Sequence, residues 1–160
     1  MKEAAFITWK DTYSVGIPQI DKQHQDLVQL TINLYEACMR GAEPRRTYFK
    51  QALHEIVGYV RFHFSAEERL MELIEFPDLA EHKKQHEHFV KKVLVDVKQF
   101  ESGKTIIPNI FVRFLRDWIL THIGKEDQKY GDYIKYAQKE SLVADKLTFT
   151  ESAVAAGGRA

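Results

Sequence analysis

The chain has 160 residues, of which 44% are hydrophobic and 29% charged, values typical of one globular domain rather than a disordered or membrane protein. Its 23 basic residues balance 23 acidic residues, so net charge favours binding neither to nucleic acid nor to an anionic membrane. The sequence has no apolar stretch long enough to insert stably in a bilayer and no signal-peptide core, and its lone Cys38 cannot form an internal disulfide, which predicts a cytoplasmic protein.

Hydrophobic residues recur every three or four positions along four segments, the spacing of one buried helix face. The predicted helices span, approximately, residues 21–39, 46–75, 79–101 and 108–125. Asp21 is the expected N-cap of the first helix, and Pro77 follows the expected end of the second, because proline cannot continue a helical hydrogen-bond ladder. Short connections imply antiparallel neighbours, so the predicted fold is all-α, an antiparallel up-down-up-down four-helix bundle.

The two ends of the chain lie outside this pattern. Residues 1–19 show no sustained period and predict an irregular N-terminal arm. Residues 127–140 look partly helical, and residues 141–160 are expected to form a loosely ordered C-terminal tail. The predicted bundle domain therefore covers residues 1–140.

Histidines occupy positions where hydrophobic core residues are expected. At about 100° per residue, His54 and His88 should face outward. The other five share the apolar faces of the four predicted helices and are His24, His63, His82, His86 and His122. Two helices carry inward polar pairs four residues apart, His63 with Glu67 and His82 with His86, a spacing that lets both side chains reach one ion.

A bundle core with this many polar groups requires an explanation. Each buried polar group without a partner costs about 1–3 kcal/mol, against a net stability of about 5–15 kcal/mol for a whole domain. Mutual hydrogen bonding or metal binding could offset this cost. One inward histidine is usually a satisfied core residue, but here every predicted helix contributes one, which favours metal binding.

The donor set also bears on the kind of metal site. Five imidazoles exceed what one tetrahedral zinc ion uses, and mixed imidazole and carboxylate ligands suit iron, and also zinc, copper or nickel. Glu67, four residues after His63, is the expected first bridge of a two-metal site. Asp127, five residues after His122, is the expected second, but five residues turn an α-helix by about 140°. We therefore predict a distorted or widened turn between His122 and Asp127, eased by Gly124.

These residues and the sequence segments around them resemble the hemerythrins, specifically the single-domain bacterial hemerythrins. The segments are VGIPQIDKQH at 15–24, HFSAEERLM at 63–71, HKKQHEHF at 82–89 and WILTHIGKED at 118–127. The similarity covers about residues 6–136. It implies a non-haem di-iron centre, with two Fe ions joined by an oxo or hydroxo bridge, that binds dioxygen reversibly for oxygen transport, storage or delivery.

The resemblance also implies roles for individual residues. The implied metal ligands are His24, His63, Glu67, His82, His86, His122 and Asp127. The three histidines latest in the chain would bind one iron, the two earlier ones would bind the other and leave one position open, and the two carboxylates would bridge. The residues placed to wall an oxygen pocket are Leu27, Phe64, Trp118, Ile119 and Ile123.

Two alternative functions remain open, an oxygen or redox sensing module and a di-iron enzyme acting on peroxide or nitric oxide. The oxygen-activating carboxylate class uses Glu-x-x-His pairs and mostly carboxylate ligands, whereas nitrogen ligands predominate here by five to two. We therefore expect a binding protein rather than an enzyme. The expected partners are dioxygen and an oxygen-consuming recipient protein.

Overall fold

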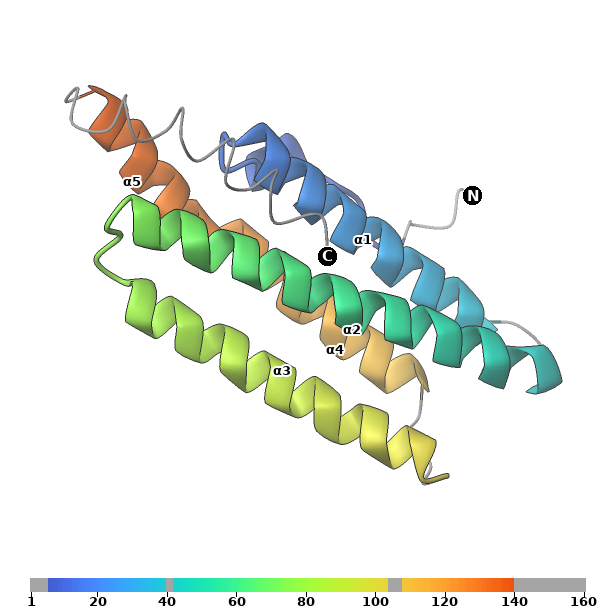
Figure 1. Ribbon diagram of the computed structural model, residues 1–160. Helices are drawn as coiled ribbons and strands as arrows, with labels where there is room; N and C mark the ends of the chain where they lie inside the picture. Colours follow the sequence, from blue (N-terminus) through green and yellow to red (C-terminus); the bar gives the residue numbers. More distant parts are fainter. Residues whose placement is uncertain (1–5, 40–41, 104–107, 140–160) are drawn as a thin grey trace.

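The structure is a computed structural model that describes residues 6–39, 42–103 and 108–139. In chain order its elements are η1 (Asp11–Tyr13), α1 (Pro18–Met39), α2 (Ala42–Leu73), α3 (Leu79–Glu101), α4 (Pro108–Thr121), the π-helix η2 (His122–Glu126) and α5 (Asp127–Lys139). The last three follow one another without a break, so four antiparallel rods make up the bundle (Figure 1). The predicted four-helix bundle is confirmed. None of the described helices combines the length and apolarity that crossing a bilayer requires.

The first helix begins earlier than predicted, at Pro18. Proline suits the first helical turn, where its missing N–H would have no helical partner. The predicted N-cap, Asp21, was therefore wrong, because this residue already lies inside the helix. Its carboxylate instead accepts hydrogen bonds from Ser14 Oγ at 2.6 Å and from the Val15 amide at 2.8 Å, which ties the N-terminal arm to the start of α1.

The second helix ends at Leu73, two residues before the predicted end. Glu75 adopts a left-handed φ of 56°, and its amide donates to the carbonyl of Glu72. The amide of Phe76 donates to the carbonyl of Met71 at 2.9 Å. This pair of bonds is the Schellman closure, which reverses the chain before proline is reached.

The fourth rod extends well beyond the predicted end at residue 125. Helix α5 continues to Lys139, and Tyr130, Ile134 and Ala137 are buried along it. The π-helix explains why the pattern looked weak there, since one extra residue in a turn shifts the apolar face by about 100°. The predicted tail at 141–160 lies outside the described residues, and the domain limits stay a prediction.

The core is divided into two hydrophobic clusters. One fills the part of the bundle that includes Phe49, Phe100 and Phe111, and the other surrounds Leu70 and Tyr130. Along each rod, most of the buried polar residues stand between residues of the first cluster and residues of the second. The N-terminal arm contributes to the second cluster, so it covers the bundle rather than extending away from it.

Gly131 tests how closely the arm packs on α5. A Cβ atom at this position would lie 3.0 Å from the Val15 carbonyl oxygen and 3.2 Å from its Cα, both backbone atoms. We expect Gly131→Ala to push the arm outward and lower the free energy of unfolding by about 1–3 kcal/mol. Urea denaturation of the full chain measures this change.

Gly58→Ala is the matched control. Gly58 is an exposed residue inside α2, and a Cβ there would meet no atom within 4 Å. Alanine should therefore raise the free energy of unfolding by about 0.5–1 kcal/mol through helix propensity alone. Equal stability of the Gly131→Ala chain and the wild type would mean that the arm is not held against α5.

Candidate metal centre

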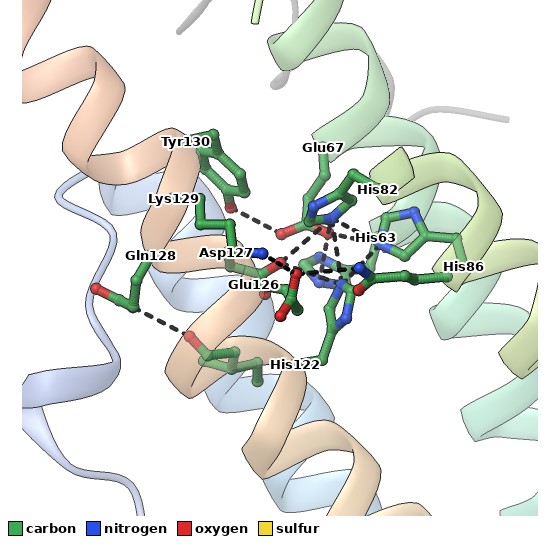
Figure 2. A network of polar contacts seen from close by, with 12 residues as sticks. His63, Glu67, His82, His86, His122, Glu126, Asp127, Gln128, Lys129 and Tyr130 are labelled. Carbon is green, nitrogen blue, oxygen red and sulfur yellow. Dashed lines mark hydrogen bonds and ion pairs between the residues drawn. The ribbon is translucent and has the colours of Figure 1, made fainter. Parts of the chain in front are cut away.

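The seven side chains predicted as ligands converge at the level between the two hydrophobic clusters. All are buried, whereas His54 and His88 are exposed, so the predicted division of five inward and two outward histidines is confirmed. The buried residues are His24 on α1, His63 and Glu67 on α2, His82 and His86 on α3, His122 on η2 and Asp127 on α5. Figure 2 shows six of them pointing toward one another from separate helices.

Three imidazoles form a compact triangle on one side of the site. The Nε2 atoms of His82, His86 and His122 lie 3.0–3.2 Å from one another. Two ligands at right angles on an ion, with bonds of about 2.1 Å, are about 3.0 Å apart. Glu67 Oε2 lies 3.3 Å from His86 Nε2 and completes a group of four donors suited to one metal ion.

A second group of donors lies beside the first. It combines His24 and His63 with Glu67 and Asp127. His24 Nε2 lies 3.1 Å from Glu67 Oε1 and 3.2 Å from Asp127 Oδ2, and His63 Nε2 lies 3.4 Å from Glu67 Oε2. The other oxygen of Asp127, Oδ1, lies 3.2 Å from His122 Nε2 in the first group. Both carboxylates therefore face both groups, as bridging ligands do.

Several carboxylate oxygens in this site have no hydrogen-bond partner among the residues that the structure describes. They are Glu67 Oε2 and both side-chain oxygens of Asp127, all inaccessible to water. An uncompensated buried carboxylate is among the most costly groups in a protein, unless it pairs with a cation or coordinates a metal. The carboxylate oxygens without a hydrogen bond and the mixed imidazole and carboxylate donors thus fit two metal ions.

Partners on the far side of two imidazoles orient them toward the centre. His63 Nδ1 lies 3.0 Å from Gln23 Oε1, and His86 Nδ1 lies 3.0 Å from Glu68 Oε1. These oxygens only accept hydrogen bonds, so each ring donates from Nδ1 and directs Nε2 toward the centre, the atom that would bind a metal. Sequence reasoning missed both partners. The only feature of the sequence that pointed to them is that each stands next to a predicted ligand, Gln23 before His24 and Glu68 after Glu67.

Tyr130 was also missed, because its place depends on the helix phase after the π-helix. Its hydroxyl donates to Glu67 Oε1 at 2.7 Å (Figure 2). This bond holds Oε1, the oxygen that also faces His24, while Oε2 faces His63 and His86. Tyr130 is fully buried, and burial is the first cause that raises the pKa of its hydroxyl well above the usual value, so it stays a donor.

The predicted widened turn between His122 and Asp127 is confirmed. Residues His122–Glu126 form a π-helix, which inserts one residue into a turn and brings positions five apart onto one face. The Gln128 side chain fastens this turn by donating to the carbonyls of Ile123 and Tyr13, each at 3.1 Å.

The part of the prediction that assigns the easing of this turn to Gly124 stays a prediction. Gly124 lacks the positive φ that would require glycine. A Cβ there would lie in ordinary contact, 3.4 Å from the Tyr13 ring. The turn is stabilised by bonds from side chain to backbone.

Apolar side chains surround the two groups of donors. Phe64 stacks on the His86 ring with centroids 3.6 Å apart, and Trp118 stacks on the His122 ring at 4.3 Å. The remaining residues predicted to wall an oxygen pocket, Leu27, Ile119 and Ile123, are buried in the adjoining hydrophobic cluster. The structure thus places two of the five predicted residues against imidazoles of the three-histidine group.

Electrostatics divide the imidazoles of the metal-free site into two kinds. Burial lowers the pKa of His63 and of His82 to about 4. Burial acts in the same direction on His24 and His86, but neighbouring carboxylates outweigh it and raise the pKa of each to about 9. Burial would raise the pKa of the two inner carboxyl groups, yet the facing imidazoles lower it.

These pKa values predict proton release when metal binds. At pH 7, His24 and His86 are protonated and His63 and His82 are neutral, so one proton each must leave His24 and His86. Anaerobic addition of Fe(II) to the apo-protein in weak buffer should therefore release protons, with at least two per chain coming from these imidazoles. Release should decline as pH rises through 9, where these two imidazoles are already neutral. A pH-stat measures it, and loading with no proton release would contradict the assignment.

A four-helix bundle whose core gathers imidazoles from every rod and carboxylates from two of them is a metal-binding type of helical bundle. The family model described as hemerythrin HHE cation binding domain matches residues 15–134. The chain belongs to the hemerythrin family.

Several named proteins and solved structures resemble it. A bacteriohemerythrin of Stenotrophomonas maltophilia (strain R551-3) is 33% identical over 131 residues, which cover 82% of this chain and 83% of that protein. A bacteriohemerythrin of Pseudomonas paraeruginosa (strain DSM 24068 / PA7) is 32% identical over 142 residues, covering 89% and 90%. A crystal structure of wild-type hemerythrin superposes with a TM-score of 0.74 at 29% identity, over 80% of this chain and 97% of that chain.

Proposed function

We propose that the chain holds two iron ions and binds dioxygen reversibly between its four rods, for oxygen transport, storage or delivery. The observation that carries this proposal is the inequality of the two donor groups. Three imidazoles serve one group and two serve the other, while the two carboxylates face both. The second position has one protein ligand fewer, and a small ligand binds where a coordination position is free.

In this proposal the ligands are divided by group. His82, His86 and His122 hold one ion, and His24 and His63 hold the other. Iron, when bound, supplies the electrons with which dioxygen is held. The hydrogen bond from Tyr130 to Glu67 keeps that carboxylate in place between the two positions.

The apolar residues around the site serve to exclude water. Leu27, Ile119 and Ile123 are each no more than 2% exposed and belong to one continuous cluster. A dry surrounding limits proton access to a bound oxygen species and so favours release over irreversible oxidation. The same three side chains also pack the bundle core, so each of them both stabilises the fold and excludes water from the site.

Binding rather than turnover is proposed because imidazoles outnumber carboxylates in the donor set. A sensing role would use the same site. The oxygen-consuming recipient protein and the cytoplasmic location stay predictions from the sequence.

Absorption spectroscopy tests the proposal directly. Aerobically purified full chain should contain about two iron ions and show a visible band that bleaches on deoxygenation and returns with air. Elemental analysis of the same sample gives the metal ratio. A band that persists without oxygen, or rapid turnover of peroxide or nitric oxide, would favour an enzyme instead.

Replacement of the apolar wall should shorten the life of the oxygenated form. We expect Leu27→Ser and Ile119→Thr to speed autoxidation by roughly tenfold or more, because water then reaches the site, while iron stays bound. Loss of the visible band with time measures the rate, and iron analysis confirms occupancy.

Leu53→Ser serves as a control for lost packing. Leu53 is as deeply buried as Leu27 and belongs to the same cluster, but it lies ten residues before His63 on α2, about 15 Å along the helix. Its autoxidation rate should stay near that of the wild type. Equal acceleration in all three variants would show that loosened packing, not the local wall, sets the rate.

A further inference from the structure

The two donor groups differ in what lies behind their imidazoles. In the three-histidine group, His86 Nδ1 donates to the Glu68 carboxylate at 3.0 Å, a charged acceptor. In the two-histidine group, His63 Nδ1 donates to the neutral Gln23 amide, and His24 Nδ1 is buried with no hydrogen-bond partner among the described side chains. A full negative charge therefore backs an imidazole of one group, while the partners found in the other are neutral or missing.

A charged acceptor changes the imidazole that it binds. A carboxylate draws the Nδ1 proton toward itself and leaves more electron density on Nε2, which strengthens the bond to a metal and favours its higher charge state. Phe64 stacks on the same ring at 3.6 Å with an interplanar angle of 2°, so the ring cannot turn away from this arrangement without losing packing. The His86 ring is thus held by Phe64, which stacks on its face, and by the hydrogen bond to Glu68 at its edge.

We infer that Glu68 is a positioning residue which, acting through His86, makes the three-histidine position the more electron-rich of the two. This inference rests on the proposed function, since it concerns the iron ions that the site is proposed to hold. The three-histidine ion then stabilises the oxidised state more strongly than the two-histidine ion. The open position would belong to the ion with the weaker donors.

Solvent reaches Glu68 through a surface cleft between α2 and α3. The cleft has a volume of about 410 Å³, and its lining includes Arg61, Ser65, Glu87 and Lys91 as well as Glu68 itself. The Glu68 side chain is 27% exposed while that of His86 is 2% exposed. Basic side chains in the lining suit an anion. If the Glu68 carboxylate is removed, a small carboxylate added in solution can therefore take its place beside His86.

Glu72 provides a matched control on the same helix. Lys83 Nζ lies 3.8 Å from Glu68 Oε2 and 3.3 Å from Glu72 Oε1, so both acids share one surface lysine. The Glu72 side chain is 62% exposed and has no ion pair with His86 in the structure described. Glu72→Gln removes the same charge from the same face without touching the imidazole.

The experiment compares iron-loaded full chains of the wild type, Glu68→Gln, Glu68→Ala and Glu72→Gln. Two properties are measured, the midpoint potential of the centre and the rate of iron loss to a ferrous chelator under anaerobic conditions. Both Glu68 variants should raise the potential and speed iron loss by about 10- to 100-fold, the usual effect of removing such a partner. Glu72→Gln should match the wild type in both.

Acetate separates an effect on the imidazole from a merely structural one. Added acetate should restore the potential and iron retention of Glu68→Ala toward wild-type values, and should do nothing to Glu68→Gln, where the amide still fills the space. If Glu68→Ala fails to fold, the near-isosteric Glu68→Gln still tests the potential. Wild-type potential and iron retention in both Glu68 variants would overturn the inference. Absence of iron from the wild type would overturn the proposed function as well.

Discussion

The burial of two carboxylates between four helices is the constraint on which the rest of this structure depends. Glu67 and Asp127 are completely removed from solvent, and three of their four oxygens have no hydrogen-bond partner among the described residues. Such charges are tolerated only beside compensating cations, which here are protonated imidazoles or metal ions. The imidazoles of His24 and His86, whose pKa values these carboxylates raise to about 9, therefore stabilise the buried carboxylates and with them the fold.

This constraint explains the irregular backbone of the fourth rod. A regular helix would turn Asp127 away from His122, and only the extra residue of a π-helix places both on the inner face. The distorted segment is fastened by Gln128, which joins it to the N-terminal arm at Tyr13. An arm with little regular structure thus contributes to the position of a buried ligand.

The position of the seven donors in the bundle also matters, because they lie between its two hydrophobic clusters. A hydrophobic cluster lies on each side of the buried donors, one with Phe49 and Phe111 and the other with Leu70 and Tyr130. The approach from the side, over Phe64 and His86, is the cleft that contains Glu68. The donors are therefore packed against apolar side chains on two sides and meet a solvent-exposed cleft at Glu68 and His86.

The sequence by itself determined the rods and the inward donors. Helical spacing is a local property, so the pairs His63 with Glu67 and His82 with His86 could be placed on one face without knowledge of neighbouring helices. Even the widened turn followed from a local mismatch, because Asp127 lies five positions after His122 and a regular helix does not place positions five apart on one face.

Only the tertiary structure decided which residues form hydrogen bonds with the donor side chains. Gln23 and His63 are 40 residues apart, and Tyr130 and Glu67 are 63 apart. Whether such side chains meet depends on the rotation and register of packed helices, which periodicity along one helix does not contain. The phase shift of the π-helix likewise hid the inward face of α5, and with it the buried position of Tyr130.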